Sequence, residues 1–229
     1  YYDGAAWVFI GNSAAGWSTT GNTGTTPGTN FIGTTDAKDL KIKVNNTIAG
    51  SIETSGNIFL GLNAGIVNTG ANNVGIGGNT LTNNTTGAQN TAIGKFSMEA
   101  STTGSNNTAV GEEALQNITT GSGNTAIGYK SMELQTSTSD NTALGFQSLM
   151  SNVANAAFGN DALANNTTGG WNTAIGSAAL FSNTTGTSNV GIGSGALYSN
   201  TTGFSNTSIG NSSLGINTTG DSNCAMGAF

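Results

Sequence analysis

The chain has 229 residues, of which 36 are glycine, and charged residues make up 7% of it, against about 25% in an ordinary globular domain. It has no histidine, and its five lysines are outnumbered by eleven acids, so the net charge of −6 offers no basic surface for the phosphates of nucleic acid. A single cysteine, Cys224, excludes an internal disulfide and, without histidine, a zinc site of Cys and His ligands within one chain.

The N-terminal part of the chain, 1–56, differs in kind from the rest. Residues 40–44, Leu-Lys-Ile-Lys-Val, alternate as a half-buried strand does, Asn45 and Asn46 can form a tight turn, and residues 47–52 can return as the partner strand. The sequence therefore predicts a β-rich cap or connector module over 1–56 with a hairpin near 40–52. All the aromatic residues of this module precede the hairpin: Tyr1, Tyr2, Trp7, Phe9, Trp17 and Phe31.

No run of about 18 apolar residues could span a membrane, and the start has neither Met nor the features of a signal peptide. The last repeat also stops two residues after Gly227. We therefore expect a segment of a longer polypeptide, with no membrane span of its own.

From residue 57 onward the sequence repeats. The motif Asn-x-small-aliphatic-Gly occurs eleven times, and its glycines follow a 17-residue period that is broken by one interval of 16 and one of 14. Such a unit is too short for a helical repeat of about 34 residues or a propeller blade of about 40, but it suits one coil of a β-solenoid. The sequence predicts an all-β fold with a parallel β-solenoid of eleven coils over 57–229. The motif glycines are Gly61, Gly77, Gly94, Gly111, Gly128, Gly145, Gly159, Gly176, Gly193, Gly210 and Gly227.

Each repeated position suggests a role. Position four of the motif is always apolar, so we expect it to face inwards together with position two, while position three, usually Ala, faces outwards. Small uncharged residues on an outward face, and a thin core, would favour packing against other chains. The motif Asn is expected to form a hydrogen-bonded ladder, and the motif Gly to need a positive φ or a close chain crossing. A second apolar file follows each glycine by four residues: Leu81, Met98, Leu115, Met132, Leu149, Leu163, Leu180, Leu197 and Leu214.

The motif Asn-Thr-Ala-Ile-Gly followed by Ala-Leu is similar to the 14-residue repeat in the head domains of trimeric autotransporter adhesins. The Asn-Thr-Thr-Gly insertions resemble repeats of phage tail fibres and bacterial surface fibres. Over residues 57–229 this resemblance implies a left-handed β-roll of 14- to 17-residue coils, intertwined or packed as a homotrimer. It also implies an extracellular structural segment, on a cell surface or virion, that serves adhesion or host attachment. A cell-surface glycan or protein receptor would bind another part of such a fibre.

The search for chemistry finds no catalytic, cofactor-binding or metal-binding residues to propose, so we expect a protein that is not an enzyme. Glu99 and Glu133 share a repeat position but lie two coils apart, roughly 10 Å at strand spacing. Glu112 and Glu113 are the only adjacent acids, and a polysaccharide-degrading tailspike that used them is an alternative. The chain has no recurring Asp like that of calcium-binding β-rolls.

Two binding functions also remain open. Loop aromatics such as Trp171, Tyr198 and Phe204 could bind glycans, although they do not recur from coil to coil. Regular Thr files could bind ice, although the strand motif offers only one Thr rank, on the face expected to hold the core Ile. Sequons such as those at Asn84 and Asn117 arise by chance in a chain this rich in Asn and Thr.

Overall fold

The computed structural model describes residues 32–149 and 155–228. The chain divides into two compact units, residues 1–38 and 39–229, and every strand of the described residues lies in the second. The aromatic residues of the expected N-terminal module fall outside the described residues. The hairpin, which the sequence assigns to that module, lies in the same compact unit as the repeats.

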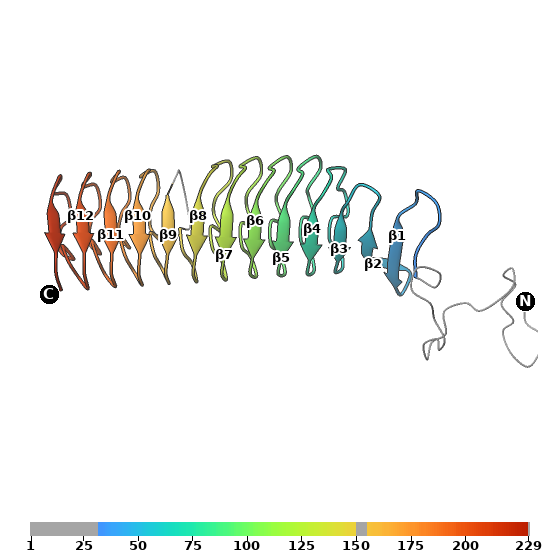
Figure 1. Ribbon diagram of the computed structural model, residues 1–229, viewed down its shortest axis with the longest axis horizontal. Helices are drawn as coiled ribbons and strands as arrows, with labels where there is room; N and C mark the ends of the chain where they lie inside the picture. The colour runs from blue at the N-terminus through green and yellow to red at the C-terminus, as the bar shows by residue number, and fades with distance from the viewer. Residues whose placement is uncertain (1–31, 150–154, 229) are drawn as a thin grey trace, which may run out of the picture. The chain divides into compact units, whose positions relative to one another are not determined.

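The described residues contain strands but no helix, and the strands form one sheet in which each is hydrogen-bonded to its neighbours in chain order. Figure 1 shows the successive coils stacked with their strands aligned. All pairings from β3 onward are parallel, so the structure confirms the predicted all-β parallel β-solenoid, with ten turns between eleven described strands. These are β3 (Ile58–Leu60), β4 (Val74–Ile76), β5 (Thr91–Ile93), β6 (Thr108–Val110), β7 (Thr125–Ile127), β8 (Thr142–Leu144), β9 (Ala156–Phe158), β10 (Thr173–Ile175), β11 (Val190–Ile192), β12 (Thr207–Ile209) and β13 (Cys224–Met226).

The pairing follows the repeat. Thr125 of β7 pairs with Thr142 of β8 after a 17-residue repeat, whereas Thr142 pairs with Ala156 of β9 after a 14-residue repeat. The shorter turn lacks the Thr-Thr-Gly element, yet its strand keeps the register of the ladder. The three extra residues of the other turns are therefore accommodated outside the strands.

A hairpin closes the N-terminal side of this ladder. Strands β1 (Leu40–Val44) and β2 (Thr47–Ile52) pair antiparallel across Asn45 and Asn46, whose φ values of 47° and 60° suit a tight hairpin turn. Strand β2 then pairs antiparallel with β3. The hairpin thus occupies the edge that β3 would otherwise leave open to pairing with another chain.

The prediction for the two faces of the strands is wrong. The middle residue of each strand, position three, lies inside the coil, while positions two and four face outwards: Ala92 is fully buried, and Ile93 is 37% exposed. A two-residue period shows which residues share a face but not which face is inside. The interior admits only small residues at this position. A Cβ added to Gly191 would already lie 3.2 Å from the Ala196 carbonyl oxygen and 3.4 Å from Leu180 Cγ.

The second apolar file forms the core, as expected. Its members from Leu81 to Leu197 are fully buried, and Leu214 in the last turn is partly buried. All of them adopt a left-handed conformation, with φ between 45° at Leu149 and 54° at Met132. This conformation costs about 1–2 kcal/mol per residue, while burying a Leu or Met side chain contributes about 1.5–3 kcal/mol. Burial therefore offsets the strain of the backbone.

The motif Asn and Gly hold successive turns together. Asn107 is representative: its backbone N–H donates to Asn90 Oδ1 at 3.0 Å, and its Nδ2 donates to the Gly121 carbonyl at 2.9 Å. The motif glycines have φ between 128° and 149°. A Cβ on Gly94 would overlap the carbonyl oxygen of Gly111 in the next turn. The predicted Asn ladder and close chain crossing are both present.

Candidate functional site

One distinctive surface is the outer side of the parallel ladder, which we call the strand face. It consists of the first and third residues of strands β3 to β13, and none of these residues is charged. Several of the third residues of these strands are 37–45% exposed: Ile76, Ile93, Ile127, Leu144 and Ile175. The first residue of these strands is most often Thr. The Thr side chains therefore lie beside the exposed aliphatic side chains and not in the core.

The strand face continues onto the hairpin. In register, Leu40 pairs with Ile52 and Ile52 with Ile58, which places these three side chains on one side of the sheet. Ile42 and Leu60 are aligned in the same way through Gly50, where an added Cβ would come within 2.9 Å of Leu60 Cδ2. The hairpin therefore extends the uncharged apolar surface rather than ending it.

The acids named from the sequence lie on a different surface and are partly neutralised. Lys130 Nζ lies 2.9 Å from Glu113 Oε2 and 3.1 Å from Glu133 Oε1. Its hydrogen bond to Glu113, and to a smaller extent its hydrogen bond to Glu133, raise the pKa of Lys130 above its usual range. Glu99 instead accepts a hydrogen bond of 2.9 Å from Gln116, which occupies the same repeat position one turn later.

In the described part of the chain, aromatic side chains form two stacked pairs between adjacent turns. The rings of Tyr129 and Phe146 have centroids 5.4 Å apart at 24°, and those of Phe181 and Tyr198 lie 5.2 Å apart at 10°. Their residues are one repeat apart, so the stacking follows from the spacing of the turns. The 17-residue period contains the signal for these pairs, which sequence reasoning missed.

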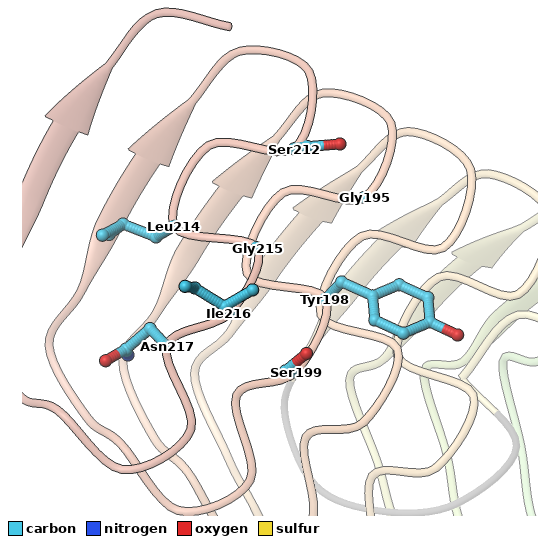
Figure 2. Close-up of a pocket in the computed structure, with 8 residues that line it drawn as sticks. All are labelled: Gly195, Tyr198, Ser199, Ser212, Leu214, Gly215, Ile216 and Asn217. Carbon is cyan, nitrogen blue, oxygen red and sulfur yellow. The ribbon is translucent and has the colours of Figure 1, made fainter. Parts of the chain in front are cut away.

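A cavity of about 720 Å³ adjoins the second pair (Figure 2). Of the three loop aromatics proposed for glycan binding, the structure places Tyr198 at this cavity; Trp171 and Phe204 lie in connections leading into β10 and β12 and do not line it. The lining residues are Gly195, Tyr198, Ser199, Ser212, Leu214, Gly215, Ile216 and Asn217. None of them carries a charge.

The remaining candidates are occupied by structural contacts or are absent from the described part of the chain. The Asn84 amide is buried and donates to the Gly87 carbonyl, and the Asn117 amide donates to the Glu133 carbonyl, each at 2.9 Å. Within residues 32–149 and 155–228, no three His, Cys, Asp or Glu side chains gather where they could hold a metal ion. The same residues include no helix of the length and apolarity needed to cross a bilayer.

Comparison with known proteins adds no relative. No protein-family model matches the chain, and neither the curated proteins nor the solved structures include a match.

Proposed function

We propose that the chain is a shaft or head segment of an extracellular trimeric fibre, on a cell surface or virion, that serves adhesion or host attachment. The observation that carries this proposal is the strand face, an uncharged and half-exposed apolar surface that follows the whole ladder. At about 4.8 Å per strand, eleven strands extend it over roughly 50 Å.

A surface of this kind favours assembly. Monomeric soluble proteins rarely expose a continuous apolar patch larger than a few hundred Å², because exposed apolar surface promotes association. The side chains of Ile93 and Ile127 cannot turn inwards, since the interior position is held by Ala92 and Ala126. Three copies that placed their strand faces around a common axis would bury both exposed ranks along the fibre.

The thin core of the coil also supports assembly with other chains. Most turns bury one Leu or Met, and the first buries Phe59 instead. Ile118 adds a further large side chain, and the rest of the core is mostly Ala and Ser, so the core is thin for a chain of this length. The proposed assembly is a left-handed roll of 14- to 17-residue coils, intertwined or packed as a homotrimer. In it the segment is structural rather than enzymatic, and another part of the fibre binds the glycan or protein receptor.

The test is the absolute mass of the purified chain by light scattering after size-exclusion chromatography. The chain has a mass of 22.7 kDa, and a trimer is expected at three times that mass. A matched pair of variants locates the interface. Ile127→Glu alters the strand face, whereas Tyr129→Glu alters a side chain of similar exposure two residues away, 40% against 37%.

We expect Ile127→Glu to give monomers and Tyr129→Glu to remain trimeric. A wild-type mass of 22.7 kDa, or equal dissociation of both variants, would contradict the proposal.

A second candidate, ice binding, is favoured by one observation. Thr91, Thr108, Thr125 and Thr142 occupy consecutive strands on the outer side of the sheet, beside the exposed aliphatic rank. A free strand face would present these hydroxyls at a regular spacing. Thermal hysteresis measured on a monomeric preparation would favour this candidate over the fibre, and its absence would remove it.

A further inference from the structure

We infer that Phe158 of one chain packs against Ala156 of a neighbouring copy, and that this contact fixes the register in which the copies of the proposed trimer align. This inference rests on the proposed function, because it assigns a specific role to one strand of the proposed interface. It concerns how the copies are aligned along the fibre, which the mass of the assembly does not report.

A repeated strand face leaves the register of an assembly open. Strands β5, β7 and β10 each present a Thr and an Ile at the same two places. A copy displaced by one turn, about 4.8 Å, would therefore place nearly the same side chains against its neighbours. Register is set by the pattern of side chains, so a unique alignment needs a strand that differs from the others.

Strand β9, which lies between β8 and β10 in Figure 1, is such a strand. Among the eleven strands of the described ladder, its first residue, Ala156, is the only alanine at that place, and its third residue, Phe158, is the only aromatic residue at the other. Both lie on the strand face, because the middle residue, Ala157, is the buried one. The ladder stays in register here, since Ala156 pairs with Thr142 and Thr173. Each copy thus carries a hollow and a protrusion at one height of the fibre.

A three-fold arrangement would bring these two features together. Around a common axis each copy makes the same contact with the next, so one edge of its strand face meets the opposite edge of its neighbour's. The first residues of the strands form one edge of this face, and the third residues form the other. At β7, Thr125 of one copy then meets Ile127 of the next. At β9, Ala156 meets Phe158, and the smaller residue makes room for the larger one.

A displaced copy would lose this match. With a displacement of one turn, Phe158 faces a Thr such as Thr142, and Ala156 faces Leu144 or Ile175. The first contact is overpacked and the second leaves a void, and both misfits are destabilising. A ring of three copies closes only if a displacement at one contact is compensated at another. Every displaced arrangement therefore has misfits at two contacts or more.

Disulfide trapping at β7, two strands away from β9, reads the register directly. All chains are the 229-residue sequence with Cys224→Ser, so the introduced cysteines are the only ones. Chains with Thr125→Cys are refolded together with chains that carry either Ile127→Cys or Leu144→Cys, and mild oxidation follows. A disulfide between positions 125 and 127 reports alignment, and one between positions 125 and 144 reports a displacement by one turn. We expect the aligned disulfide to exceed the displaced one by at least about tenfold.

A double variant removes the odd strand. Ala156→Thr with Phe158→Ile gives β9 the two outward residues of β10, so the assembly should remain a trimer by mass while the displaced disulfide rises to the level of the aligned one. The matched control is Thr108→Val with Val110→Ile, which gives β6 the two outward residues of β4. It changes the same two places without a hollow or a protrusion, and it should keep the original ratio.

The inference is overturned if the trimer forms both disulfides equally, if the double variant keeps the original ratio, or if the control loses it as fully as the double variant does. In each of these cases the mass still reports a trimer, so the proposed function stands. A monomeric wild type would instead overturn the proposed function and this inference together.

Discussion

Phe59 fills the space that Leu or Met fills in later turns, because Gly65 stands where those residues stand. Phe59 occupies the middle of β3, where most later strands have Ala, and it is 1% exposed. A Cβ added to Gly65 would overlap the phenyl ring, and one added to Gly75 in the next strand would lie 2.8 Å from Phe59 Cδ1. Phe59 thus fills, from the strand side of the coil, the space that a Leu or Met fills from the opposite side in later turns.

This exchange predicts a rescue. Phe59→Ala alone should lower the free energy of unfolding by about 3–5 kcal/mol, because it leaves a cavity. Adding Gly65→Leu should recover much of this loss, since Gly65 has a φ of 59°, close to the 49° at which Leu81 is accommodated. Urea unfolding of the single and double variants measures the coupling. If the losses of unfolding free energy in the two single variants simply add up in the double variant, the side chains at positions 59 and 65 do not fill the same space.

The Asn ladder predicts a large effect from one amide. Asn107→Ala should destabilise the protein by about 3 kcal/mol, because it leaves the Asn124 N–H and the Gly121 carbonyl without their partners. Thr103→Ala, an exposed change in the same turn, is the control and should cost less than about 0.5 kcal/mol. Thermal unfolding compares the two, and equal melting temperatures would refute the role of the ladder.

Two buried serines should respond in opposite directions. Ser101 Oγ is buried without a hydrogen-bond partner among the described residues, whereas Ser131 Oγ lies 3.1 Å from Ser148 Oγ. Ser101→Ala should therefore leave stability unchanged or raise it by about 1 kcal/mol, and Ser131→Ala should lower it by about 1 kcal/mol. Urea midpoints of the two variants decide this, and a loss at Ser101 as large as at Ser131 would contradict it.

The hairpin predicts a dependence on pH. Burial alone would raise the pKa of Glu53, but hydrogen bonds from Lys41, Asn57 and Ser51 outweigh it and hold that pKa below its usual value. A carboxyl with a lowered pKa stabilises the folded state above the unfolded pKa, about 4.3, and this contribution is lost as the pH falls through the folded pKa.

The variant Glu53→Gln should accordingly lose stability at pH 7, by less than about 1 kcal/mol for a pair this near the surface, and match the wild type at pH 2. Chemical unfolding at both pH values measures the difference. Exposed Glu112→Gln is the control and should show no such dependence. A Glu53→Gln deficit that persists unchanged at pH 2 would argue against the ionised carboxyl as its source.

Much of the architecture could be predicted because the repeat places the same local chemistry in every turn. The spacing of Gly94 and Gly111 reveals the coil, and the need for glycine where two backbones meet accounts for its recurrence. Asn45 and Asn46 mark the hairpin, since Asn tolerates the positive φ that a tight turn requires. The cavity beside Tyr198 could not be located in this way, because it depends on which side chains of two successive turns face the same side.

The sequence by itself determined the period, the parallel stacking and the sharing of one face by Thr125 and Ile127. Only the tertiary structure decided that this face is outside and that Ala126 is inside. Neither face carries charge, so polarity does not distinguish them, and hydrophobicity alone favours the wrong one. The deciding quantity is the width of the coil, which leaves room for a methyl group opposite a Leu or Met but not for a second large side chain.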